Sequence, residues 1–160
     1  MHTLSFEAQS KSGRYQEILP QIESLLSDES NVIANLAGVA AVLKEAFNFF
    51  WVGFYILEGD FLVVGPYQGP LACSRILSTQ GVCGHAVQMQ KTIIVPDVAL
   101  FSGHIACNAL SRSEIVVPLW VNQKIVAVLD IDSAVLDDFD ETDRIGLEAI
   151  IQRVQHYWPT

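Results

Sequence analysis

The sequence EIVVPLWVNQKIVAVLDIDS, residues 114–133, decides the fold of this chain. It holds two runs rich in β-branched and other apolar residues, 114–121 and 124–133, separated by the pair Asn122-Gln123. Such runs, joined by a short polar turn, are typical of two antiparallel strands in a hairpin. The sequence therefore predicts a sheet built around this hairpin.

Two carboxylates extend an apolar row on the second of these strands. Because side chains alternate along a strand, Val126, Val128, Asp130 and Asp132 share one face, and the other apolar residues share the opposite face. Carboxylates are rarely buried without partners. Either the row has reached solvent at its end, or the two acids line a pocket.

The register of the hairpin decides whether Glu114 joins these two acids. A plain two-residue turn at Asn122-Gln123 places Glu114 on the opposite face of the sheet. A three-residue loop, or a bulge near Pro118, places it across from Asp132 on the same face. A pocket lined by all three acids therefore requires one of these irregularities.

The stretch before the hairpin, GHIACNALSRSE at residues 103–114, shows no apolar periodicity and is expected to be a loop. A loop of this length in a compact domain is usually functional or disordered. Ile105 and Leu110 can anchor it, which favours the functional interpretation. We interpret Cys107 as a reactive thiol that this loop presents.

Residues 49–57, FFWVGFYIL, form the first clear strand. Four apolar side chains occupy its predicted core face: Phe50, Val52, Phe54 and Ile56. The other face carries Trp51, Gly53 and Tyr55, two rings beside a glycine gap where a ligand could approach the sheet. Such rings can hold a methyl or thioether group by dispersion and a cation by their π faces. Alternatively, and with equal weight, this face of the strand is simply packed under a helix and binds no ligand.

Helical patterns lie at both ends of the chain. The first is expected over residues 15–26, where Pro20 either kinks the helix or marks its start, and this helix is a candidate homodimer interface. A second is expected over residues 31–47. The last starts at Asp140 as N-cap and runs to about His156.

Shorter elements lie between them: a hairpin loop at 58–60, a returning strand at 61–64, a short helix ending near residue 90 and a strand at 92–95. Together these elements predict one α+β domain over residues 1–160. Its expected parts are a helical segment at about 14–47, a mostly antiparallel sheet with its loops at about 48–135, and a closing helix at about 140–156.

Composition excludes several classes of function. The chain has 160 residues, 51% hydrophobic and 17% charged, as in a globular domain. Its net charge of −9 argues against binding to nucleic acid or to an anionic membrane. Residues 1–10 lack the apolar core of a signal peptide, and no apolar run reaches the ~18 residues of a membrane span. We therefore expect a cytoplasmic protein.

Three cysteines, Cys73, Cys83 and Cys107, are far apart in the sequence. The close pairs typical of zinc sites are absent, so we expect no metal and no cofactor. An odd count also disfavours a structural disulfide framework. The cysteines are either small buried hydrophobes or a redox set. Cys83, between glycines and near a helix start, could have a lowered pKa.

Seven motifs resemble the free methionine-(R)-sulfoxide reductases, which are single GAF-domain enzymes. They are WVGFY at 51–55, GPYQG at 65–69, AC at 72–73, GVCG at 81–84, GHIAC at 103–107, SEIVVP at 113–118 and LDIDS at 129–133. The resemblance extends from about residue 30 to 155, with the three cysteines and three acids at the relative spacings of the family. Asn108 departs from it, because an acid is expected after the cysteine.

The resemblance implies a GAF-like fold and a role for each cysteine. Cys107 would attack the sulfoxide sulfur and become a sulfenic acid. Cys73 would resolve this acid as a disulfide that thioredoxin reduces, with Cys83 as a second resolving thiol. His104 is close to Cys107 in sequence and could act on it, but a purely structural role for this histidine is an equal alternative.

The resemblance also implies a substrate site for free methionine sulfoxide. Glu114, Asp130 and Asp132 would hold the ammonium group and assist protonation of the leaving oxygen. Trp51 and Tyr55 would enclose the methyl-sulfoxide end. Two alternatives stay open: a GAF module that senses a small molecule without chemistry, and a redox sensor in which a disulfide switches a partner.

Overall fold

A six-stranded antiparallel sheet, in the order β3-β2-β1-β6-β5-β4, forms the centre of the structure, a computed structural model that describes residues 3–159. The strands are β1 (Trp51–Glu58), β2 (Phe61–Gln68), β3 (Arg75–Leu77), β4 (Ile93–Val95), β5 (Ser113–Val121) and β6 (Lys124–Ser133). The helices are α1 (Lys11–Ser27), α2 (Val32–Phe47), α3 (Gly81–Met89), α4 (Glu141–His156) and a 3₁₀ turn, η1 (Val98–Leu100).

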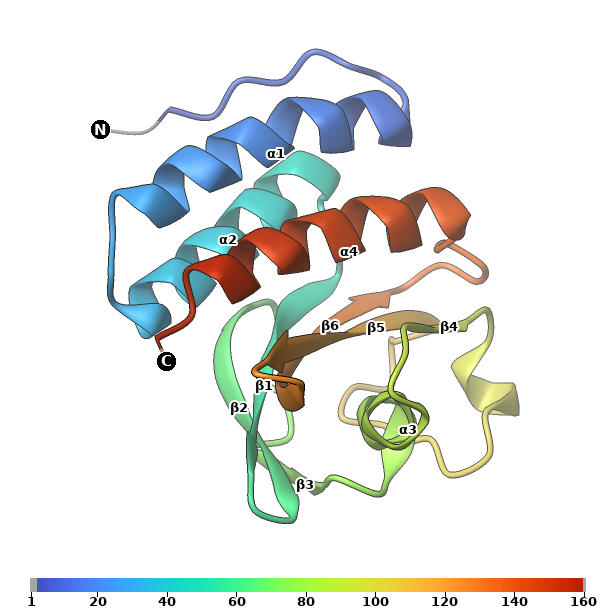
Figure 1. The fold of residues 1–160 in the computed structure, drawn as a ribbon. Helices are drawn as coiled ribbons and strands as arrows, with labels where there is room; N and C mark the ends of the chain where they lie inside the picture. The colour runs from blue at the N-terminus through green and yellow to red at the C-terminus, as the bar shows by residue number, and fades with distance from the viewer. Residues whose placement is uncertain (1–2, 160) are drawn as a thin grey trace.

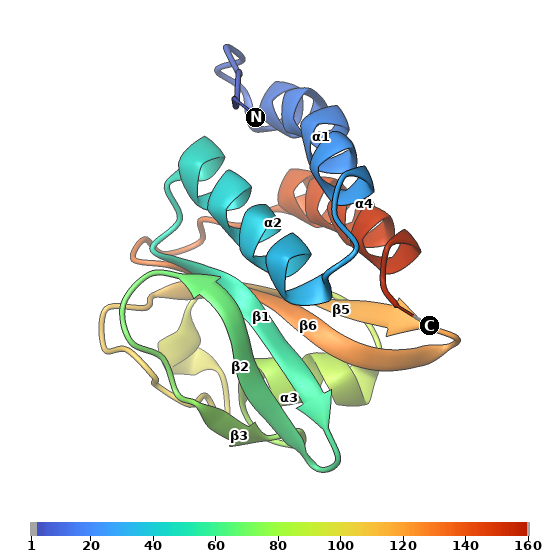
Figure 2. The same ribbon diagram turned by 90° about the vertical axis from the view of Figure 1, so that its left-hand side faces the viewer.

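The helices form unequal layers on the two faces of the sheet. Helices α2 and α4 lie on one face, α1 rests on these two helices, and α3 lies on the opposite face (Figures 1 and 2). The predicted α+β class, with a mostly antiparallel sheet and helices at both ends of the chain, is confirmed. None of the helices among residues 3–159 is long and apolar enough to cross a membrane.

The face of the sheet toward α2 and α4 carries the main apolar core. Val52 and Phe54 of β1 are fully buried there, together with Leu129 and Ile131 of β6. Burying each such side chain contributes roughly 1.5–3 kcal/mol. Alternation then directs the intervening residues of the same strands to the other face, under α3.

Phe50 does not follow this alternation. It precedes β1, which begins at Trp51, and packs against the apolar cluster on the α3 side of the sheet. The prediction that Phe50 belongs to the core face was therefore wrong, because the strand starts at Trp51, two residues later than expected.

A bulge in β6 sets the register of the central hairpin. The turn at Asn122 and Gln123, with φ of 50° and 63°, pairs Val121 with Lys124 as a plain two-residue turn does. The register then shifts: Trp120 pairs with Ile125, and Leu119 pairs with Ala127. One residue of β6, at position 126, is thus left without a partner.

The consequence of this bulge is that Glu114 lies directly opposite Asp132. Directly opposed residues share a face, so the condition for a three-acid face is met. Val126 itself packs against the core cluster on the helix side. Its predicted place on the face of Asp130 was wrong, because the bulge interrupts the alternation there.

Helix α1 is longer than expected. It starts at Lys11, with Ser10 accepting a hydrogen bond from Gly13 N as N-cap, and continues through Pro20. The alternative that the helix starts near Pro20 is therefore wrong. Burial of Ile18 and Ile22 on either side of the proline holds the helix against its neighbours.

Strand β2 is also longer than expected and extends to Gln68 through Pro66. Its outer neighbour β3 pairs only with residues 61–63, so Pro66 lies on an edge, where a missing N–H is tolerated. The register of β1 and β2 shifts between Gly53 and Tyr55, which accommodates the proline. This extension brings Tyr67 alongside Gly53.

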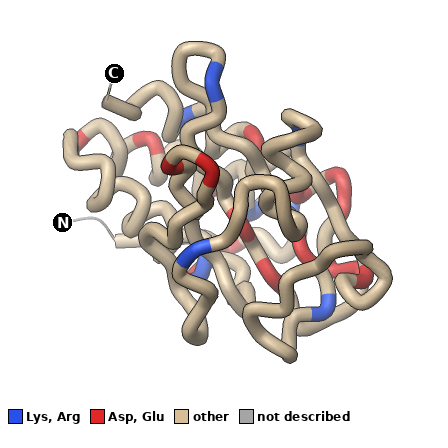
Figure 3. Tube along the Cα trace, turned by 90° about the horizontal axis from the view of Figure 1, so that it is seen from below, with Lys and Arg blue, Asp and Glu red and all other residues tan. Residues whose placement is uncertain are grey.

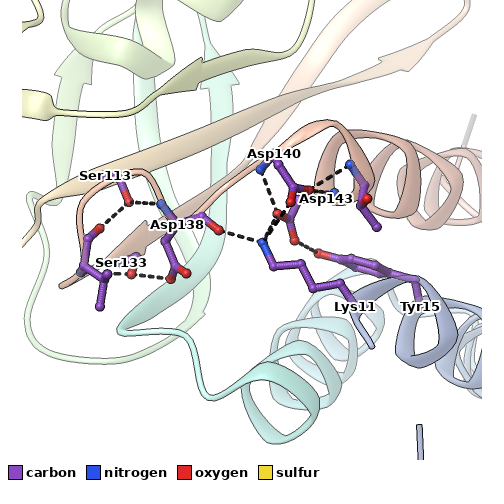
Figure 4. A network of polar contacts seen from close by, with 9 residues as sticks. Lys11, Tyr15, Ser113, Ser133, Asp138, Asp140 and Asp143 are labelled. Carbon is purple, nitrogen blue, oxygen red and sulfur yellow. Dashed lines mark hydrogen bonds and ion pairs between the residues drawn. The ribbon is translucent and has the colours of Figure 1, made fainter. Parts of the chain in front are cut away.

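A buried polar network joins α1 to the start of α4 (Figure 4). The Tyr15 hydroxyl donates to Asp143 Oδ1 at 2.8 Å, and Lys11 Nζ lies 2.6 Å from Asp143 Oδ2. Lys11 also donates to the carbonyl of Asp138. The same turn is tied to the strand ends, because the Ser133 hydroxyl donates to Asp138 Oδ2 at 2.5 Å. The network thus links the outer helix to the ends of the central strands.

We expect Tyr15→Phe to lower the free energy of unfolding by about 1–2 kcal/mol, because it leaves a fully buried Asp143 oxygen without this donor. Tyr157→Phe is the matched control, since its hydroxyl donates to Glu23 at a solvent-accessible position. Urea denaturation of both variants measures the difference. Equal losses in the two variants would contradict a stabilising role for the buried network.

Candidate active site

The α3 side of the sheet brings together residues from three neighbouring strands. In register, Trp51 of β1 lies beside Asp132 of β6, which lies beside Glu114 of β5. Gly53 lies beside Asp130 in the same way. Figure 3 looks up at the molecule from this side and shows acidic positions in the middle of the chain trace as well as at its edges.

A small cavity of about 40 Å³ lies over these residues. It is covered by the first turn of α3 and by the loop between η1 and β5. Seven residues expected to act at the site line it: Trp51, Tyr55, Cys83, Cys107, Glu114, Asp130 and Asp132. Of the predicted site residues, Cys73 does not line the cavity but is bonded to Cys107, which does.

The two aromatic side chains of β1 form one wall. Trp51 and Tyr55 are buried and lie with their rings 5.9 Å apart. The Tyr55 hydroxyl donates to the carbonyl of Cys73 at 2.9 Å, so this ring also fixes the segment that carries Cys73.

The gap expected over Gly53 is filled by protein. Tyr67 stacks on Trp51 at 5.1 Å, and a Cβ at position 53 would lie 2.2 Å from Tyr67 Cβ. Glycine is therefore needed here for ring packing and leaves no open gap for a ligand. Sequence reasoning missed Tyr67, because the returning strand was expected to end at residue 64.

Two of the three acids are buried, Asp132 is partly exposed, and among the described residues no lysine or arginine forms an ion pair with any of them. Glu114 and Asp130 are 5% and 6% exposed, and Asp130 Oδ1 has no hydrogen-bond partner among the described residues. His104 Nε2 lies 3.6 Å from Glu114 Oε2. Partial burial lowers the pKa of His104, however, so this imidazole is less readily protonated to a cation.

Burial and mutual repulsion raise the pKa of all three acids. The pKa of Glu114 rises to about 8, chiefly through burial and then through the charge of Asp132. Burial and the neighbouring Glu114 raise the pKa of Asp130 well above its ordinary value. The pKa of Asp132 is raised by burial and by Asp130. Carboxyl groups of this kind can hold a proton near neutral pH and donate it.

Ser111 is a further polar neighbour that sequence reasoning missed. Its side chain donates a hydrogen bond to Asp132, which partly offsets the rise in the pKa of that acid. It belongs to the loop at 103–114 that the sequence singled out, but nothing in the pattern distinguished it from the other serines.

A disulfide joins Cys73 to Cys107, with 5.4 Å between their Cα atoms. The bond ties the segment between β2 and β3 to the loop before β5. It pairs the two cysteines that the resemblance indicated. Asn108, the departure from the family pattern, accepts a hydrogen bond from Leu110 N and so stabilises a local turn in the loop.

Cys83 is the remaining free thiol and lies in the first turn of α3. It is 3% exposed. Burial, together with the charges of Asp130 and Glu114, raises its pKa well above the ordinary value. The suggestion of a lowered pKa was therefore wrong, because two strand carboxyls and desolvation outweigh the effect of the helix start.

The N-terminus of α3 adds a group of backbone amides to the cavity, opposite in polarity to the acids. Gly81, Val82 and Cys83 line it, and the N-cap residue Gln80 makes no side-chain cap. Free amide groups at a helix N-terminus favour an anion. The site thus combines an acidic wall that favours a cation with a helix end that favours an anion, an arrangement that suits a zwitterion beside a redox-active sulfur.

The raised pKa of Glu114 predicts how stability depends on pH. A group whose pKa is higher in the folded state stabilises the fold fully below its unfolded value, about 4.5, and this stability is lost as the pH rises toward about 8. We expect the free energy of unfolding to fall over this range, and to fall less in Glu114→Gln, which cannot ionise. Glu58→Gln, at an exposed position, should follow the wild type. Denaturation at pH 5 and pH 8 measures this. An unchanged pH dependence in Glu114→Gln would contradict the raised pKa.

Comparison with known proteins places these features in a family. The GAF domain family model matches residues 31–155, close to the range that the motifs indicated. GAF domain-containing protein A of Dictyostelium discoideum is 56% identical over 144 residues, which cover 89% of this chain and 91% of that protein. The free methionine-R-sulfoxide reductase of Escherichia coli (strain K12) is 42% identical over 146 residues, 91% of this chain and 88% of that protein.

The solved structures agree with the sequence relatives. The X-ray structure of free methionine-R-sulfoxide reductase from Neisseria meningitidis, in complex with its substrate, superposes with a TM-score of 0.97 at 51% identity. The match covers 98% of this chain and 95% of that chain. This protein therefore belongs to the GAF-domain family and, within it, to the free methionine-(R)-sulfoxide reductases, which are oxidoreductases.

Proposed function

We propose that this protein reduces free L-methionine (R)-sulfoxide to methionine with Cys107 as the nucleophile, and that thioredoxin recycles it. The observation that carries the proposal is the Cys73–Cys107 disulfide at the cavity, with Cys107 lining the same space as three buried acids. A redox-active sulfur beside acids that hold protons is what reduction of a sulfoxide requires.

The first step of the proposed reaction takes place at the sulfoxide sulfur. The Cys107 thiolate attacks this sulfur, while a buried carboxyl donates a proton to the sulfoxide oxygen. This attack forms a sulfur–sulfur bond. The sulfur–oxygen bond of the substrate then breaks, its hydroxyl group passes to Cys107 Sγ as the sulfur–sulfur bond breaks, and methionine leaves with the electron pair of that bond, so that Cys107 becomes a sulfenic acid. Glu114, whose pKa is about 8, can supply such a proton near neutral pH.

Resolution follows at the surface side of the cavity. The Cys73 thiolate attacks the sulfenic sulfur, water leaves, and the disulfide forms. The Cα atoms of these two residues are within disulfide range, which supports Cys73 as the resolving thiol. Cys83 keeps its predicted role as a second resolving thiol, although its burial and raised pKa make it a slow nucleophile. A dithiol such as thioredoxin then attacks the disulfide, takes up the oxidation and restores both thiols.

The substrate carries charges opposite to those that the site presents. In our proposal, Glu114, Asp130 and Asp132 hold its ammonium group, and the first turn of α3 receives its carboxylate. Trp51 and Tyr55 flank the sulfoxide end, where their rings give dispersion contacts. A methionine sulfoxide inside a peptide has no ammonium group and leaves the acids unpaired, so we propose selectivity for the free amino acid. Preference for the R epimer rests on the family alone.

The size of the cavity supports a change in the loop during turnover. At about 40 Å³ the cavity in the disulfide form has room for a few water molecules and is too small for methionine sulfoxide. Breaking the Cys73–Cys107 bond releases the loop from the segment after β2. We propose that reduction opens the site for substrate, and that disulfide formation after methionine has left closes it.

The proposal also covers the reductant, the cellular location and the oligomeric state. Thioredoxin is the proposed partner, because the resting product of the reaction is a disulfide. A cytoplasmic location follows from the need for a thiol reductant, and a homodimer through α1 stays a prediction. The alternative of a redox sensor uses the same disulfide but requires no turnover, so the release of methionine separates the two.

We expect Cys107→Ser to abolish methionine formation, because a hydroxyl cannot replace the thiolate. Cys73→Ser should still form one equivalent of methionine per protein in a single turnover, since resolution follows the chemical step. Thioredoxin-coupled turnover and single-turnover methionine release measure both effects. Substantial turnover by Cys107→Ser, or failure of the folded wild type to release methionine, would refute the proposed function.

A further inference from the structure

Three metal-binding side chains meet inside the cavity, each from a different element. One ligand atom each from Cys83 of α3, Glu114 of β5 and Asp130 of β6 lies within 4.8 Å of the other two, and all three residues are buried. We infer that these residues form a binding site for a divalent cation such as Zn²⁺. Binding of this cation would inhibit the protein.

The need for a cation at this point is visible in the polar contacts. Asp130 is 94% buried, lines the cavity and has side-chain hydrogen bonds with Glu114 and Cys83, yet its Oδ1 atom has no hydrogen-bond partner among the described residues. Burying an unpaired carboxylate oxygen is costly. A cation held between the three side chains would give this oxygen a ligand and would offset the repulsion between Glu114 and Asp130.

The donor set selects among cations. A thiolate with two carboxylates suits Zn²⁺ and the similar but softer Cd²⁺, whereas Mg²⁺ and Ca²⁺ prefer a shell of oxygen ligands only. In a tetrahedral zinc site the ligand atoms lie roughly 3.4–3.6 Å apart, and the three atoms here lie within 4.8 Å of one another, close enough to converge on one ion. A fourth position faces the cavity and can take a water molecule.

A single cation can reach this position from the edge of the cavity, although the cavity is too small for methionine sulfoxide. Asp132, the third acid, is partly exposed and borders the same space. The ion would lie where the proposed function places the substrate ammonium. Metal binding itself does not depend on that function, but competition with the substrate does.

The disulfide form allows a clean measurement, because Cys83 is then the one free thiol of the three cysteines. Titration of the oxidised full-length protein with Cd²⁺ should produce the ultraviolet charge-transfer band of a cadmium–thiolate bond, saturating at one equivalent. Zn²⁺ should displace the Cd²⁺ and abolish the band, whereas Mg²⁺ should not.

Variants separate this site from other acids. Cys83→Ser should lose the band, and Asp130→Asn, which keeps the thiol, should bind Cd²⁺ about tenfold more weakly or worse. Asp60→Asn, in the exposed β1–β2 hairpin, removes the same charge elsewhere and should bind as the wild type does. Absence of the band in the wild type, or equal affinity in Asp130→Asn and Asp60→Asn, would overturn the inference.

Competition is measured in a protein with Cys73→Ser and Cys107→Ser, in which Cys83 is the sole thiol. Calorimetric titration with methionine (R)-sulfoxide should show at least tenfold weaker binding when Cd²⁺ saturates the site. If Cd²⁺ binds through Cys83 and Asp130 but leaves this affinity unchanged, the metal site stands, while inhibition and the assignment of these acids to the ammonium group both fail.

Discussion

Three carboxyl groups gathered at one largely buried place, with no cation paired to them among the described residues, are the constraint on which the rest of this structure depends. Burial and mutual repulsion raise the pKa of Glu114, Asp130 and Asp132. An ion pair within the protein would remove this cost, but it would also fill the site. In the proposed function, these acids without a paired cation instead leave a place for the ammonium group of the substrate, and they supply protons for the chemistry at Cys107.

The rest of the fold can be understood as support for this group. The bulge at Val126 moves Glu114 onto the face of Asp132, and the antiparallel pairing of β1 with β6 brings Trp51 beside them. The main core on the opposite face packs these strands against α2 and α4. The disulfide then joins the covering loop to the segment after β2. In the proposed reaction, the chemical state of these two sulfur atoms therefore controls access to the acids.

Local patterns in the sequence predicted most of the regular elements, whereas the set of residues expected at the site came from local patterns together with the family resemblance. Alternating β-branched residues identified β5 and β6, and an irregular loop rich in functional groups identified Cys107. What it could not predict depends on contacts between distant segments. No glycine or proline marks Val126, so the alternation of β6 gave no sign of the bulge. The pKa of Cys83 depends on acids from two other strands, and Tyr67 reaches Gly53 only because β2 continues through Pro66.

The most direct test of the unpaired acids as an ammonium site compares two substrates that differ only at the amine. The measurement is kcat/KM for free methionine (R)-sulfoxide and for its N-acetyl derivative, with thioredoxin as reductant. We expect acetylation to lower kcat/KM by about 10³-fold or more, because the buried acids lose the cation that pairs with them. Equal values for the two substrates would show that the acids do not bind the ammonium group, and would contradict the central claim.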